Sequence, residues 1–170
     1  MATTKNTTPL CPTPSVMIVD IEGYQIDHEF IIKELALYDP FTMSFWVGTF
    51  QPPYSLNSLK KRVTDRIERS NTHGLTWNEG QYSYFLLGSI LQAFAGRYSL
   101  YAHGMYKCHI IQNIINCSVG DLCAMDFPSS VYDLPFAAFC HFHDSTKQTC
   151  ALDKAARLGQ RYVNLFSMKC

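Results

Sequence analysis

The chain has 170 residues, of which 47% are hydrophobic and 16% are charged, and its formal net charge is zero. This length and composition predict a single folded domain with a sizeable core. The zero net charge argues against a strongly electrostatic nucleic-acid binder, although it leaves room for a local basic groove.

The first fourteen residues are expected to form a disordered leader, because three prolines and five threonines in residues 1–14 cannot pack. Residues 15–170 then make up one domain. We find no apolar signal-peptide core and no apolar run of about 20 residues, the length that a membrane span needs. The expected location is therefore the cytoplasm or nucleus. Thiols stay reduced there, so clustered Cys and His indicate metal binding rather than disulfides.

Three strands are predicted first along the chain. Residues 15–21 form a continuous apolar run that is typical of a buried central strand, and Gly23 is expected to end it. Residues 30–38 and 41–50 follow as the second and third strands, separated by a turn at Asp39 and Pro40. Short turns between successive strands predict an antiparallel meander.

Helices and strands then alternate. We expect helices over residues 55–70, 81–95, 106–116 and 150–166, and strands over 99–102 and 121–125. We summarise the order as βββαβαβα. It predicts an α/β fold in which helices flank both sides of a five-stranded mixed sheet.

The most informative motif is the C-x2-H-x6-C spacing of Cys140, His143 and Cys150. Two thiolates and one imidazole within eleven residues suit the tetrahedral coordination of zinc. Cys150 is expected at the start of the last helix, where the helix dipole favours a thiolate. Two alternatives stay open: the cluster is a coincidence of buried cysteines, or His141 replaces His143 as the ligand.

A second motif is Asp20-x-Glu22 at the end of the first predicted strand. Carboxylates at i and i+2 on a strand share one face, as two-metal phosphoryl chemistry requires. An exposed strand end is the ordinary alternative. Together with the order βββαβαβα, the motif resembles the ribonuclease H-like fold of DEDD-type 3′–5′ exonucleases.

The resemblance to those exonucleases fails at the remaining catalytic positions. Lys107 and Lys154 stand where the family has its third and fourth acids, and Thr149 stands where it has a histidine. Asp153 is the nearest shifted acid, but it is turned by about 100° on a helix. We therefore expect a vestigial site in which Lys107, Lys154 or both neutralise the remaining carboxylate pair.

The segments FIIKELAL and FCHFHDSTKQTCALDKA resemble a related family, the maelstrom domain. This is a ribonuclease H-like domain in which a Glu-Cys-His-Cys zinc set replaces the catalytic acids. The resemblance implies one structural Zn²⁺ per chain, held by Glu34, Cys140, His143 and Cys150. A surface position on an edge strand is the competing interpretation of Glu34.

The resulting functional expectation is a zinc-stabilised, catalytically inactive domain that binds single-stranded RNA, a protein partner or both, in small-RNA or transposon silencing. A basic helix face would contact the RNA backbone, unless it is simply solvated; it comprises Lys60, Lys61, Arg62, Arg66 and Arg69. One alternative is a metal-dependent 3′–5′ exonuclease using Asp20, Glu22 and Asp153. The other is a scaffold that only binds proteins. The oligomeric state is not predicted.

Overall fold

The computed structural model describes residues 15–69, 71–137, 140–143 and 149–167. The expected leader, residues 1–14, lies outside this part of the chain. No helix within it is both long enough and apolar enough to cross a membrane.

A five-stranded mixed sheet forms the centre of the domain, in the order β3-β2-β1-β4-β5. Its strands are β1 (Val16–Ile26), β2 (Glu29–Tyr38), β3 (Phe45–Thr49), β4 (Ser99–Ala102) and β5 (Gly120–Asp121). The first three strands form the predicted antiparallel meander, while β4 and β5 run parallel to β1. The predicted α/β class and the five-stranded mixed sheet are confirmed.

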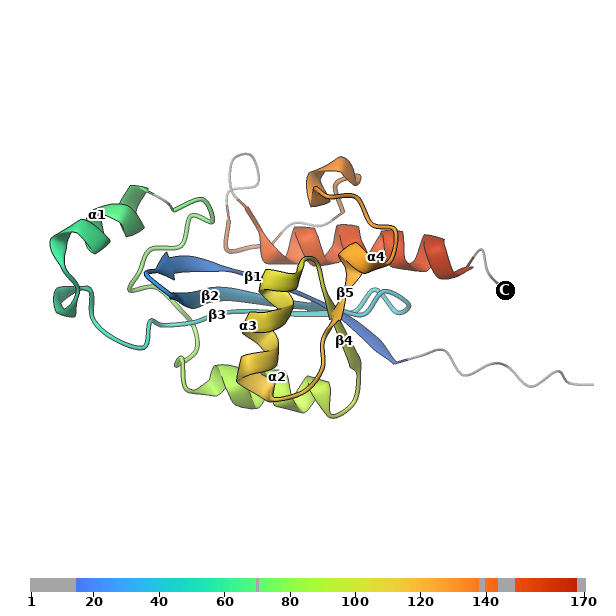
Figure 1. The fold of residues 1–170 in the computed structure, drawn as a ribbon, viewed down its shortest axis with the longest axis horizontal. Helices are drawn as coiled ribbons and strands as arrows, with labels where there is room; N and C mark the ends of the chain where they lie inside the picture. The colour runs from blue at the N-terminus through green and yellow to red at the C-terminus, as the bar shows by residue number, and fades with distance from the viewer. Residues whose placement is uncertain (1–14, 70, 138–139, 144–148, 168–170) are drawn as a thin grey trace, which may run out of the picture.

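Helices cover both faces of this sheet (Figure 1). They are α1 (Lys61–Arg69), α2 (Leu86–Ala95), α3 (Met105–Ile115) and α4 (Ala151–Ser167). Helices α2 and α3 pack on one face through a core that includes Leu91 and Ile111, and α4 packs on the other through Ala155 and Leu158. Both α1 and α2 lie between β3 and β4, so the predicted order βββαβαβα is one helix short.

Strand β1 contributes side chains to the core on both faces of the sheet, because successive side chains point to opposite faces. Met17 and Val19 point to α2 and α3, whereas Val16 and Ile18 point to α4. The prediction that Gly23 ends this strand was wrong. The strand continues to Ile26, because Gly23 has no Cβ, and a Cβ there would lie 2.0 Å from the carbonyl oxygen of Ile31.

The predicted fifth strand over residues 121–125 was also wrong beyond its first residue. The Asp121 carboxylate accepts a hydrogen bond from the backbone N–H of Cys123, which closes a 3₁₀ helix, η2 (Leu122–Ala124). Two further 3₁₀ helices are η1 (Leu56–Ser58) and η3 (Val131–Asp133). Helix α1 is shorter than predicted because η1 takes the first turn of the 55–70 segment.

Candidate metal centre and charged cluster

Glu34 lies inside the sheet rather than on its edge, because β2 pairs with β1 on one side and β3 on the other. The register passes from Glu22↔Glu34 to Gly23↔Ile32, so Lys33 is the extra residue of a β-bulge. The Glu34 side chain is fully buried on the side that α4 covers. A carboxylate in such a position costs several kcal/mol unless it is paired.

Cys140 and His143 lie in one tight turn, which the backbone N–H of His143 closes on the carbonyl oxygen of Cys140 at 3.5 Å. The backbone N–H of Phe142 points at the Cys140 sulfur, also at 3.5 Å. Cys150 directly precedes α4, and the backbone N–H of Asp153 donates a hydrogen bond to its sulfur. Backbone amides therefore stabilise negative charge on both sulfurs.

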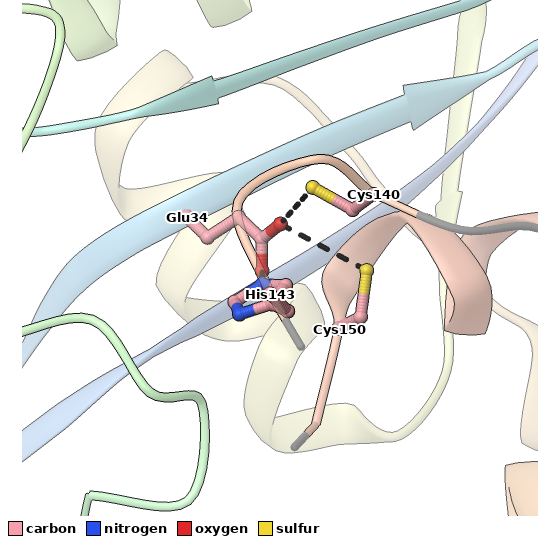
Figure 2. Close-up of side chains that lie close together, drawn as sticks. All are labelled: Glu34, Cys140, His143 and Cys150. Carbon is pink, nitrogen blue, oxygen red and sulfur yellow. Dashed lines mark hydrogen bonds and ion pairs between the residues drawn. The ribbon is translucent and has the colours of Figure 1, made fainter. Parts of the chain in front are cut away.

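These three side chains meet Glu34, although it is more than 100 residues away in the sequence (Figure 2). The Glu34 carboxylate lies 3.3 Å from the Cys140 sulfur, 4.0 Å from the Cys150 sulfur and 2.9 Å from His143 Nε2. The four donor atoms all lie within 4.8 Å of one another. A tetrahedral zinc site with bonds of about 2.0–2.3 Å needs donor atoms roughly 3.3–3.8 Å apart, so the four groups fit one ion after small adjustments.

The acidities of the cluster also suit a cation. The hydrogen bond from the Cys140 thiol lowers the pKa of Cys150, and the His143 imidazole lowers it further. The same thiol–thiolate pairing raises the pKa of Cys140. Burial opposes a charge on His143, but hydrogen bonds to Cys150 and Glu34 raise its pKa above the usual 6.5. The cluster thus brings the Glu34 carboxyl and an acidified Cys150 thiol together, and a metal cation bound between them would neutralise their negative charge.

The structure also decides between the two neighbouring histidines. His143 is 3% exposed and points into the cluster, whereas His141 is exposed and packs on the Phe142 ring. One supporting group was not predicted: the backbone N–H of Ala151 donates to Glu34 at 3.0 Å. It fixes the carboxylate from the first residue of α4, as outer hydrogen bonds commonly orient metal ligands.

Glu34→Ala is expected to weaken metal binding by less than Cys140→Ser or Cys150→Ser. A carboxylate is the hardest of the four ligands for zinc, and water can take its place. Competition with a chromogenic chelator measures the three affinities. An affinity unchanged by Glu34→Ala would show that Glu34 is not a ligand.

The second group of side chains is the charged cluster, made up of Asp20, Glu22, Lys107 and Lys154. Lys107 Nζ lies 2.6 Å from Asp20 Oδ1 and 3.4 Å from Glu22 Oε1, and Lys154 forms an ion pair with Glu22. The prediction that lysine ammonium groups neutralise the carboxylate pair is confirmed. The pair lies mid-strand rather than at a strand end, just beyond Ile18, the last β1 residue that pairs with β4.

Two neighbouring side chains complete the picture of this cluster. Thr149 donates its hydroxyl to Glu22 at 3.2 Å, at the position where an exonuclease would carry its histidine. Asp153 does not join the cluster: its carboxylate pairs with Arg157 at 2.8 Å and accepts the backbone N–H of Ala137. Asp153 is therefore not positioned as a third acid.

Burial dominates the electrostatics of the charged cluster. It raises the pKa of Asp20 from 3.8 to about 6, against the attraction of Lys107 and Lys154. Glu22 is also penalised by burial, but the two lysines outweigh this and lower its pKa. The ionised form is thus less favourable for Asp20 than for Glu22, and the neighbouring lysines are what stabilise it.

Lys33, the extra residue of the β2 bulge, is a further buried ionisable residue, and no role was predicted for it. Its ammonium donates to the carbonyl oxygens of Trp77 and Glu79, at 2.6 and 2.5 Å. Burial lowers the pKa of Lys33 to about 8. These two bonds attach the loop before α2 to the bulge of β2, next to Glu34. The bulge is a long-range feature, so the sequence pattern gave no signal for it.

Four of the five predicted RNA-binding residues lie on the solvent-facing side of α1, away from the sheet, and Lys60 directly precedes the helix. Val63 and Ile67 pack inward, and all five basic side chains are exposed. Within the described part of the chain, none of the five forms an ion pair.

Comparisons with protein-family models, with curated proteins and with solved structures find no match to this chain. The sites are therefore interpreted from their own chemistry.

Proposed function

We propose that this chain is a zinc-stabilised, non-catalytic domain of the ribonuclease H-like type, similar to the maelstrom domain, that binds single-stranded RNA. The observation that carries the proposal is the pairing of Asp20 and Glu22 with Lys107 and Lys154 beside a Glu-Cys-His-Cys cluster. The proposed context of small-RNA or transposon silencing rests on the family resemblance alone.

The ion pairs support the non-catalytic part of the proposal. Two-metal nucleases hold divalent cations on clustered carboxylates. Here two ammonium groups contact those carboxylates, and Mg²⁺ would have to displace them against electrostatic repulsion. Assays with Mg²⁺ and Mn²⁺ on single-stranded substrates test this point. Cleavage that Asp20→Ala abolishes would establish the exonuclease alternative instead.

We propose a structural role for the zinc ion. Glu34 comes from the middle of the sheet, Cys140 and His143 come from the turn at residues 140–143, and Cys150 directly precedes α4. An ion held by all four would join these three elements and supply folding free energy. Four protein ligands leave no open coordination position for substrate, as is usual for structural zinc. Elemental analysis of carefully purified protein should give one zinc per chain.

RNA binding is expected to depend on the exposed basic face of α1. Exchanging Lys61 and Arg66 for glutamate should weaken binding to any single-stranded sequence. It should also make the slope of log affinity against log salt shallower by about 0.7 for each lost phosphate contact. Fluorescence anisotropy at several salt concentrations measures both quantities.

The matched control for this experiment is Arg97→Glu, which reverses an exposed charge in the turn between α2 and β4. An effect per reversed charge equal to that of the Lys61 and Arg66 exchanges would mean that only net charge matters. Failure of the wild-type protein to bind RNA would favour the protein-interaction alternative.

A further inference from the structure

A pocket of about 280 Å³ lies beside the charged cluster, between the first turns of α3 and α4 and the loop that forms η3. None of its lining residues belongs to the Glu-Cys-His-Cys cluster. The residues that matter for its chemistry are Asp20, Lys107, Ser129, Ser130, Tyr132 and Lys154.

The first indication of a ligand is an unsatisfied carboxylate oxygen. Asp20 is 1% exposed, and its Oδ1 accepts a hydrogen bond from Lys107. Its Oδ2 is also buried but has no hydrogen-bond partner among the described residues. An unsatisfied buried acceptor is destabilising, so a ligand that brings an O–H or N–H donor would remove this penalty.

The second indication is the balance of charge around that oxygen. Asp20 and Glu22 carry two negative charges when ionised, and Lys107 and Lys154 carry two positive ones. A free ion of either sign would disturb this balance, whereas a neutral polar group would not. Each ammonium has three N–H donors. Lys107 uses two of them on the carboxylates, and Lys154 makes one described bond, to Glu22, so donors are left for ligand oxygens.

Adjacent hydroxyl groups match both requirements, because each hydroxyl can donate one hydrogen bond and accept another. The pocket volume lies just below the range of about 300–1,000 Å³ that is usual for small-molecule sites, which suits one sugar ring. At the rim, the Tyr132 side chain is 54% exposed and offers an aromatic surface for a base. Arg157 lies 5.7 Å from the centre of that ring and adds positive charge there.

We propose that this pocket binds the vicinal diol of a ribose without a metal ion. Asp20 Oδ2 accepts a hydrogen bond from one hydroxyl, Lys107 donates to a hydroxyl oxygen, and the attached base packs against Tyr132. The 3′ end of RNA and a free nucleoside both present this diol. The RNA form of the inference rests on the proposed RNA binding, and the nucleoside form does not.

Two pairs of probes test the inference on the zinc-loaded full chain in buffer without Mg²⁺. The first pair is a short single-stranded RNA with a free 3′ diol and the same RNA with a 3′-phosphate. The second pair is adenosine and 2′,3′-dideoxyadenosine, followed by NMR. The ligand without the diol loses a hydrogen bond to a charged group. Each diol ligand should therefore bind at least about tenfold more tightly than the member of its pair that lacks the diol.

Two variants link that preference to the pocket. Asp20→Asn should reduce the tenfold ratio to near one, and zinc content together with circular dichroism verifies that this variant folds. Tyr132→Ala leaves the buried residues in place and should weaken both diol ligands. Phe85→Ala removes an aromatic side chain that is 87% exposed at the N-cap of α2, and it serves as the matched control for Tyr132→Ala.

The outcomes separate this inference from the proposed function. RNA that binds equally with a blocked and a free end, together with no preference for adenosine, overturns the inference and leaves RNA binding intact. Adenosine that binds through Asp20 while RNA does not bind supports the pocket and refutes the RNA function. A Tyr132→Ala variant with unchanged affinity for both diol ligands would refute the placement of the base.

Discussion

Cys150→Ser is expected to abolish metal binding and to unfold the domain. The Cys150 sulfur lies at the start of α4, 4.0 Å from Glu34, and serine oxygen is a poor zinc ligand. A structural zinc ion contributes on the order of 10 kcal/mol or more of apparent binding free energy. That equals most of the about 5–15 kcal/mol of net stability that a typical domain has. Metal analysis and thermal unfolding measured by circular dichroism give the two readouts.

Cys123→Ser and Cys117→Ser are the controls, because both thiols are exposed and lie outside the cluster. Each should keep one zinc and the wild-type melting temperature. Because an unfolded Cys150→Ser variant is prone to aggregate, the wild-type chain provides an independent test. A strong chelator should lower its melting temperature, and added zinc should restore it. The proposal of a structural zinc would be contradicted by a wild-type protein with metal content near zero, or by a melting temperature that the chelator does not change.

The sequence predicts the local part of this centre well and the long-range part only through resemblance. Cys140, His143 and Cys150 lie within eleven residues, so their spacing alone indicates a common ion. Glu34 joins them only because β2 is an interior strand with a bulge at Lys33. Strand neighbours and bulges depend on pairing between distant segments, which apolar periodicity does not report.

Each error in the predicted fold has a single contact as its cause. Gly23 was expected to end a strand, since glycine is unfavourable in strand interiors. It is retained because the backbone of β2 approaches too closely for any side chain. The apolar residues after Asp121 were expected to extend a strand, but one side-chain hydrogen bond turns them into η2. In both places a single contact overrides the average preference of the segment.

Lys107→Ala is expected to destabilise the fold by about 3 kcal/mol. Removing one partner of a buried ion pair costs about 3–5 kcal/mol, and the lower end applies because Lys107 is 24% exposed. The cost arises at Asp20, which is 1% exposed and would have to carry its charge with only the weaker attraction of Lys154, or take up a proton. Chemical denaturation measures the change in the free energy of unfolding. Lys61→Ala, an exposed lysine on α1, is the control and should change it by no more than about 0.5 kcal/mol.

A pH series distinguishes a lost ion pair from simple loss of packing around the Lys107 stem. Burial already raises the pKa of Asp20 from 3.8 to about 6 in the wild-type protein, and removing Lys107 raises it further. A carboxyl whose pKa is higher in the folded state binds more protons when folded, so its effect on stability becomes less favourable as pH rises through that range. The deficit of Lys107→Ala relative to wild type should therefore be largest near neutral pH and shrink as the pH falls towards 5. Adding Asp20→Asn to Lys107→Ala should recover part of the loss at neutral pH, because the unpaired charge is then gone. A deficit that is equal at both pH values and unchanged in the double variant would show that Lys107 acts through packing and does not neutralise the carboxylates.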